Sequence, residues 1–463
     1  MPPAESATSR RVPLRSLYAA AIVVLAAGLA WEPWLAFGAI LGGGLLAVTL
    51  RWPLAVVAAM LAIGPLDLSF LTGGFKSLFE RLGGLDMNGI RLIVVSAGLG
   101  MGIVRDRAQW PRLASPPVRW YVAFLLYAAV TVGYSLDPVE GLRLLLKLTW
   151  PLLIFLVVSR PGRTWEEIER LTDWLLVGAA VLIVLNPVFV LQGDLYVEDT
   201  GEVRLMGAGT HQNPFSFAML AVVLVSLGRF AARGHARYLA LAAGALVWIG
   251  LTFTRITFLA GVVAFGVVAL YAAIVRRNWR GALAGAGAGL AVVLVMAPSF
   301  MLRTFGYIPG PGDVWALARD PVALYEAVNW SGREIFWGVL ALSWMQSPWV
   351  GLGLGSSSGI LKSLFPPEMG LVAHNEYLRL GTDAGVVGLL LFTAAMLAWV
   401  REAARAGQSP DPRIQEVALP ALAVMVAWGV ISITDNAFDY YAPFTQVAGF
   451  LVGAGLVLGR ERP

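Results

Sequence analysis

Long apolar segments recur along the whole chain and constrain its fold more than any other feature. About fourteen runs approach the roughly 20 residues that an α-helix needs to cross a bilayer. Only 14% of the 463 residues are charged, whereas soluble domains carry about 25%. The sequence therefore predicts an all-α polytopic membrane protein with about 12–14 transmembrane helices, since two runs are short. The runs cover residues 17–31, 34–50, 53–70, 90–104, 118–134, 142–159, 171–190, 213–230, 238–254, 256–275, 282–302, 377–399, 416–433 and 444–459.

The basic residues predict the orientation of these spans. With the N-terminus inside, 22 of the 34 lysines and arginines fall in cytoplasmic segments, which are short enough for the positive-inside rule to hold. The first run lacks a small-residue cleavage site and is interpreted as an uncleaved span. This arrangement predicts N-terminal transmembrane helices over 1–302, a long periplasmic loop over 303–373 and C-terminal transmembrane helices over 374–463.

The composition also indicates which partners the protein can bind. The chain has no cysteine, so it forms neither disulfides nor thiolate metal sites. No basic run is interleaved with stacking aromatic residues in a soluble domain, so nucleic acid is not an expected partner. The cytoplasmic arginines are expected to face anionic lipid headgroups.

Three residues on the predicted outer side stand out. His374 begins an apolar run, where a histidine is costly unless it is used. Arg255 is the only charged residue between Tyr238 and Arg276, and it either binds a substrate anion or snorkels to lipid phosphate. Arg333 falls in the first turn of a helix expected to start at Gly332, where it either strengthens an anion site or is a solvated surface arginine.

Further polar residues are secondary candidates. Glu140, Arg143 and Lys147 share one helix face, which indicates either function or mutual pairing. His211 either takes part in a site or caps the next span. Carboxylates at 435 and 439 either orient a substrate or His374, or are ordinary loop residues. Arg379 and Asp383, four residues apart, are expected to pair, and the glycine-rich segment 351–355 is expected to be a flexible hinge.

The order of several motifs resembles the bacterial O-antigen ligase and polymerase family (WaaL and Wzy). His374-Asn375 is followed by nine residues and then Gly385-Val386-Val387-Gly388. The turn Thr254-Arg255-Ile256-Thr257 and the group Arg333, Trp337 and Pro348 to Gly355 are similar to family motifs. Gly209 to Pro214 looks like the family's Pro-Asn turn, although the order here is Asn-Pro. The resemblance covers roughly residues 200–400.

The resemblance implies an inverting, metal-independent, GT-C-like glycosyltransferase of the bacterial inner membrane, without a cofactor and with its site facing the periplasm. The expected donor is O antigen on undecaprenyl diphosphate, and the expected acceptor is lipid A–core. His374 would be the general base, and Arg255 and Arg333 would bind the diphosphate. A polymerase using the same donor is the alternative, and a polysaccharide transporter or flippase is the alternative of another class. The possible additional polar site residues are Arg143, Lys147, His211, Asn375 and Asp435.

Overall fold

The computed structural model describes residues 33–64, 87–106, 114–191, 195–197, 203–205, 212–330, 332–366 and 372–460. This part of the chain is a helical bundle with a short antiparallel ribbon of β1 (Leu195–Val197) and β2 (Val203–Leu205). The helices up to the ribbon are α2 (Pro33–Arg51), α3 (Pro53–Ile63), α5 (Met87–Arg105), α7 (Pro116–Val132), α8 (Pro138–Val158) and α9 (Trp165–Leu191).

The second half begins with four long helices, continues through four short ones and ends with three more long ones. These are α10 (Gln212–Arg233), α11 (Ala236–Thr252), α12 (Arg255–Ile274), α13 (Trp279–Phe305), α14 (Pro311–Arg319), α15 (Pro321–Ala327), α16 (Arg333–Trp344), α17 (Ser356–Leu364), α18 (Glu376–Gly407), α19 (Pro412–Thr434) and α20 (Gln446–Arg460). A 3₁₀ helix (Ala437–Tyr440) and a π-helical turn (Tyr441–Thr445) join α19 to α20.

The apolar runs of the sequence become helices. Every predicted run coincides with a helix except 17–31, which lies outside the described residues. Within the described ranges seven helices are long and apolar enough to cross a membrane, or nine if each of two bent pairs counts as one span. The protein is therefore an all-α polytopic membrane protein.

One pair of predicted spans differs from its prediction. The end of α2 and α3 meet at an angle of 115° at Trp52, so they form a broken span or a re-entrant segment. Pro53 follows Trp52 and disfavours the helical conformation there. The 11 residues of α3 rise only about 16 Å, roughly half of the hydrocarbon thickness. Residues 65–70 of the predicted span lie outside the described part.

The bundle is centred on the C-terminal helices. The span Ala437–Gly459 is 83% buried, whereas the span formed by α9 is only 28% buried. Small residues let α20 approach α8 closely: a Cβ added at Gly449 would lie 2.2 Å from the carbonyl oxygen of Pro151. Trp399 on α18 packs on Phe155 of α8 with ring centroids 5.1 Å apart. These contacts fix α18 and α20 relative to α8.

Helix α18 is broken near its start, at Gly385. This glycine has φ 65° and ψ −169°, a conformation that side chains disfavour. The break frees the carbonyls of Thr382 and Asp383, which accept hydrogen bonds from the backbone N–H groups of Leu352 (2.8 Å) and Gly353 (2.9 Å). The segment 351–355 is thus largely buried and hydrogen-bonded to α18, and the expectation of a flexible hinge is wrong.

The predicted pair of Arg379 and Asp383 is also wrong. The carboxylate of Asp383 accepts from the N–H groups of Gly355 (2.9 Å) and Ser357 (2.7 Å), so it anchors the start of α17. Arg379 pairs instead with Glu376, at 2.7 Å. Backbone N–H groups at a helix start compete well for a carboxylate, because they have no partner within the helix.

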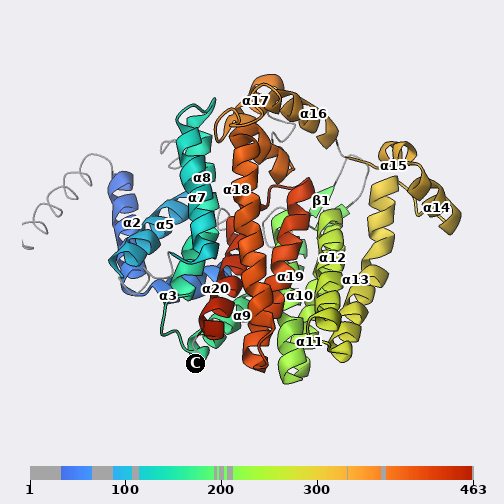
Figure 1. Ribbon diagram of the computed structural model, residues 1–463, viewed down its shortest axis with the longest axis horizontal. Coiled ribbons are helices and arrows are strands. Elements are labelled where there is room, and N and C mark those ends of the chain that lie inside the picture. The colour runs from blue at the N-terminus through green and yellow to red at the C-terminus, as the bar shows by residue number, and fades with distance from the viewer. Residues whose placement is uncertain are drawn as a thin grey trace, which may run out of the picture.

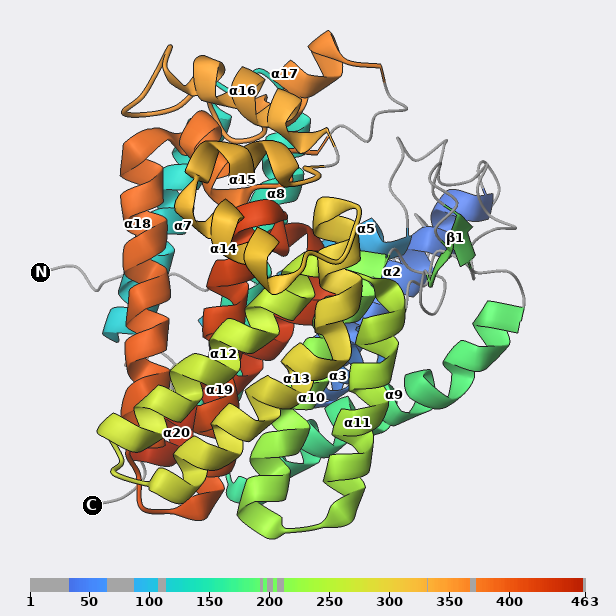
Figure 2. The same cartoon turned by 90° about the vertical axis from the view of Figure 1, so that its right-hand side faces the viewer.

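The described residues of the predicted loop 303–373 form a helical cap on one end of the bundle. It contains α14 to α17, and α16 and α17 lie across the bundle end opposite the C-terminus (Figure 1). α14 and α15 lie to one side, next to the upper end of α13 (Figure 1 and Figure 2). The connections from α10 to α11, from α12 to α13 and from α18 to α19, with the predicted cytoplasmic arginines in them or in the adjoining helix turns, lie at the other end.

Cysteine labelling will test which compartment each end faces. We expect Gly312→Cys to react with an impermeant thiol reagent from the periplasm, because positive-inside counting places α14 outside. Ala236→Cys, at the opposite end and also exposed, is the matched control and should react only from the cytoplasm. The opposite pattern would invert the topology. The chain has no other cysteine, so each label reports one position.

Candidate functional site

His374 lies at the capped end of the bundle, two residues before α18. Its backbone has φ 48°, which is uncommon for a residue other than glycine. Its Nδ1 atom lies 3.5 Å from Oδ1 of Asp435, at the long limit of a hydrogen bond, and its side chain is 23% exposed. A small molecule can therefore reach the imidazole, while a carboxylate faces one of its two nitrogens.

Asp435 is held firmly, because it is fully buried just after α19. It accepts hydrogen bonds from the side-chain amide of Asn213 (2.5 Å), the N–H of Asn436 (2.8 Å) and the hydroxyl of Tyr440 (3.1 Å). Burial alone would raise the pKa of Asp435, but the nearby imidazole of His374, the charge of Arg333 and the hydrogen bond from the Asn436 N–H hold it below its ordinary value. The group is therefore a carboxylate at neutral pH.

Arg333 joins the same place from the cap. It is the first residue of α16, and its N-cap is Gly332 with φ 74°, so the helix starts one residue later than predicted. Its Nη1 donates to the carbonyl oxygen of Thr434 (2.6 Å), the residue before Asp435. One turn further, Nε1 of Trp337 donates to the carbonyl of Ala373 (2.9 Å), the residue before His374. The structure thus brings His374, Asp435 and Arg333 together.

Arg255 lies at the start of α12 and connects to this group through intermediates. Its Nη1 donates to the carbonyls of Asn329 and Arg303, and Asn329 is four residues before Arg333. Two residues along α12, the hydroxyl of Thr257 lies 2.7 Å from that of Ser216 on α10. Asn213, whose amide binds Asp435, begins that same turn of α10.

The secondary candidates have different surroundings. Asn375 is the N-cap of α18, because its side chain accepts from the N–H of Leu378 (2.8 Å). Arg143 is 44% exposed and pairs with Glu140 at 3.5 Å, one of the two alternatives for that helix face. Lys147 pairs with Asp439 at 2.6 Å, on the helical turn that follows Asp435. His211 lies outside the described residues.

An ion-pair network that the sequence did not predict lies behind the site. Asp439 binds Lys147 of α8 and Arg379 of α18 (2.9 Å), and Arg379 in turn binds Glu376. Glu376 is fully buried and faces the N–H of Phe438 at 3.4 Å. The network therefore ties the turn that carries Asp435 to α8 and α18. The available indication was a lysine and an arginine within two apolar runs, a glutamate just before one of these runs and an aspartate in a polar turn.

Replacement of Asp435 by asparagine will test its role as a positioning residue. The amide keeps the shape but loses the charge that orients the imidazole and stabilises its protonated form. If His374 acts as a base, we expect turnover to fall on the order of 10²-fold with little change in donor affinity. A variant that keeps the wild-type turnover per folded molecule but yields less folded protein would reduce Asp435 to a structural role.

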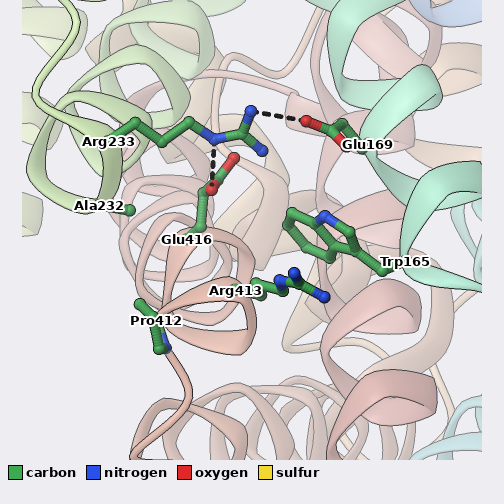
Figure 3. Close-up of a pocket in the computed structure, with 7 residues that line it drawn as sticks. All are labelled: Trp165, Glu169, Ala232, Arg233, Pro412, Arg413 and Glu416. Carbon is green, nitrogen blue, oxygen red and sulfur yellow. Dashed lines mark hydrogen bonds and ion pairs between the residues drawn. The ribbon is translucent and has the colours of Figure 1, made fainter.

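The opposite end of the bundle holds a separate pocket. Its volume is about 350 Å³, and Figure 3 shows Arg233 spanning it between Glu169 (2.6 Å) and Glu416 (2.8 Å). Arg229, which is buried, pairs with Glu416 as well. These ion pairs join α9, α10 and α19 at the predicted cytoplasmic end. Since His374 lies at the other end, the pocket is no part of the candidate site.

A search for metal ligands among the described residues and a comparison with known proteins both gave negative results. Among the residues that the structure describes, no group of three or more His, Cys, Asp or Glu side chains is arranged to hold a metal ion. No family model matches the chain, and no curated protein matches it either. The proposed function therefore depends on the motifs and on the geometry of the site.

Proposed function

We propose that the protein is an O-antigen ligase, an inverting GT-C-like glycosyltransferase of the bacterial inner membrane. It would move a glycan from undecaprenyl diphosphate to a sugar hydroxyl of lipid A–core in lipopolysaccharide biosynthesis. The observation that carries the proposal is the partly exposed His374 imidazole facing the buried Asp435 carboxylate, with Arg333 bound to the adjacent carbonyl. In this arrangement His374 would be the base, Asp435 would orient it and Arg333 would supply a nearby positive charge, all at one end of the helical bundle.

The pair can supply the proton transfer that such a reaction needs. A neutral imidazole that donates from Nδ1 toward Asp435 presents the lone pair of Nε2 to the acceptor hydroxyl. The hydroxyl oxygen attacks the anomeric carbon from the face opposite the diphosphate. The new O–C bond forms as the bond from carbon to the diphosphate oxygen breaks, and the proton passes to Nε2. Asp435 then stabilises the positive imidazolium.

The arginines suit the leaving group. A diphosphate gains negative charge as it departs, and fixed cations lower the energy of that charge without any metal. A guanidinium has five N–H donors, so Arg333 can bind one carbonyl and still present a fork to phosphate oxygens. Arg255, at the N-terminus of α12, adds a second guanidinium on the same side of the bundle. Both are proposed to contact the donor from the periplasmic side.

Reconstitution tests the proposal. Purified protein in liposomes is mixed with glycan on undecaprenyl diphosphate and with lipid A–core, and ligation is followed as a gel shift of the core. We expect a shift that requires both substrates. Longer glycans on undecaprenyl diphosphate, formed without lipid A–core, would indicate the polymerase instead. Movement of the donor between leaflets without any transfer would indicate a transporter and contradict the enzyme.

A further inference from the structure

Three aromatic side chains form a row along the cap, from α15 to α16. Their ring centroids are 5.4 Å apart between Tyr325 and Trp330 and 5.7 Å apart between Trp330 and Trp337. Tyr325 is 56% exposed, and the two tryptophans are half-buried. We refer to Tyr325, Trp330 and Trp337 as the aromatic row.

The row is held in place by its own polar atoms. Nε1 of Trp330 donates to the carbonyl of Tyr325 (3.0 Å), and Nε1 of Trp337 donates to the carbonyl of Ala373 (2.9 Å). The backbone N–H of Asn329 donates to the carbonyl of Thr304 at the end of α13 (2.8 Å). The bonds of the two indole N–H groups restrict the rings of Trp330 and Trp337, so a ligand that stacks on these two rings would cost little conformational entropy in the protein.

The row also lies beside both proposed diphosphate ligands. Asn329, whose carbonyl binds Arg255, directly precedes Trp330, and Arg333 follows Trp330 by three residues. At its inner end, Trp337 binds the carbonyl next to His374. The row therefore begins at the site and ends at the exposed ring of Tyr325.

We infer that the aromatic row is the subsite for the glycan of the lipid-linked donor. This inference rests on the proposed function. The first sugar of the donor is bonded to the diphosphate, so a diphosphate held by Arg255 and Arg333 places the following sugars beside Trp330. The C–H faces of sugar rings carry slight positive charge and stack on the electron-rich faces of aromatic rings, while the indole N–H groups stay bonded to the protein.

The surrounding charges favour a glycan over a lipid surface. On α14 and α15 and at their ends, three carboxylates at 313, 320 and 326 stand against one arginine at 319. Two of the carboxylates act within the fold: Asp320 caps α15, and Asp313 accepts from the N–H of Gly310 (3.0 Å). This excess of negative charge on α14 and α15 disfavours anionic headgroups at the Tyr325 end of the row, whereas Arg255 and Arg333 lie beside Trp330. An uncharged, hydroxyl-rich ligand meets no such repulsion.

Binding measurements on two lipids test the subsite. The probes are undecaprenyl diphosphate and the undecaprenyl-diphosphate-linked glycan isolated from the host bacterium, each titrated against the full protein in nanodiscs. We expect Tyr325→Ala to weaken binding of the glycan-bearing lipid about 3- to 10-fold and to leave the bare lipid unchanged. Tyr325→Phe, which keeps the ring, should bind both lipids as the wild type does.

Two further variants sharpen the result. Trp330→Ala should likewise weaken binding of the glycan-bearing lipid alone. If Trp330→Ala misfolds, Tyr325→Ala still tests the subsite, because Tyr325 is exposed. Trp315→Ala, on α14 and 67% exposed, removes a comparable ring away from the row and should change neither affinity.

The outcomes separate the inference from the proposed function. If the wild type prefers the glycan-bearing lipid but Tyr325→Ala and Trp330→Ala keep that preference, the subsite is wrong and the ligase proposal stands. Equal losses for both lipids, shared by Trp315→Ala, would make the row a lipid anchor. Equal affinity of the wild type for both lipids would also overturn the subsite. A wild type that binds neither lipid would overturn the proposed function itself.

Discussion

The variant His374→Ala is expected to lose glycan transfer while the protein stays folded and binds the lipid-linked donor. The imidazole is proposed to act on the acceptor hydroxyl, and the diphosphate is proposed to be held by Arg255 and Arg333. General-base catalysis is worth about 10²–10⁴-fold, so the transfer rate should fall by at least about 10²-fold. The measurement is gel-shift ligation by the reconstituted protein, together with donor binding to the same preparation.

The matched control is His235→Ala. His235 precedes α11 at the opposite end of the bundle, so its loss should leave the rate unchanged. A His374→Ala protein that keeps more than about a tenth of the wild-type rate would contradict the base assignment, because the lower bound for such a base is about 10²-fold. Asp435 and His211 would then be the next candidates for the base.

The pH dependence of the wild-type transfer rate is an independent test of the histidine base. A protonated imidazole cannot accept a proton, so transfer by a histidine base should fall as the pH is lowered. Asp435 cannot cause this fall. Its folded pKa is below the ordinary value, so its contribution to stability is complete above that ordinary value, about 3.9, and is lost only as the pH drops through the lower folded value.

The membrane-spanning helices were predictable from sequence, because the free-energy cost of placing polar groups in lipid depends on the residues of each segment alone. A run of apolar residues near 20 in length must be a helix there, whatever it packs against. The breaks depend on partners and were not predictable in the same way. Gly385 can leave the helix because Leu352 and Gly353, distant in sequence, supply N–H groups to the carbonyls that the break frees. The bend at Trp52 had a local cause in Pro53, which the hydropathy pattern does not weigh.

The sequence predicted which residues belong to the candidate site, but it did not predict how they are placed relative to one another. The sequence named His374, Arg333 and Asp435 separately, and it left open whether Asp435 orients the histidine. Their proximity follows from α16 crossing the ends of α18 and α19, a tertiary contact with no short-range pattern. The same limit explains Arg379: helix spacing favoured Asp383 as its partner, but Glu376 and Asp439 are closer in the folded chain. Asn375, one residue before α18, has the sequence pattern of an N-cap.

The variants Arg255→Lys and Arg333→Lys are each expected to lose most transfer activity although both keep the positive charge. A diphosphate is bound by the planar fork of a guanidinium, which matches two phosphate oxygens at once, whereas an ammonium group is a point charge. Loss of one donor of this kind costs on the order of 10²-fold in rate. Affinity for undecaprenyl diphosphate should fall as well, which separates these variants from His374→Ala.

The control for the arginines is Arg319→Lys. Arg319 ends α14 on the same cap and is exposed, so its replacement tests whether any arginine on this surface matters. Lysine binds lipid phosphate about as well as arginine through its charge, so a lipid anchor would tolerate the change. Near wild-type rates in both Arg255→Lys and Arg333→Lys would therefore identify these residues as anchors. A loss confined to these two, with Arg319→Lys active, would assign the leaving-group diphosphate to the space between the starts of α12 and α16.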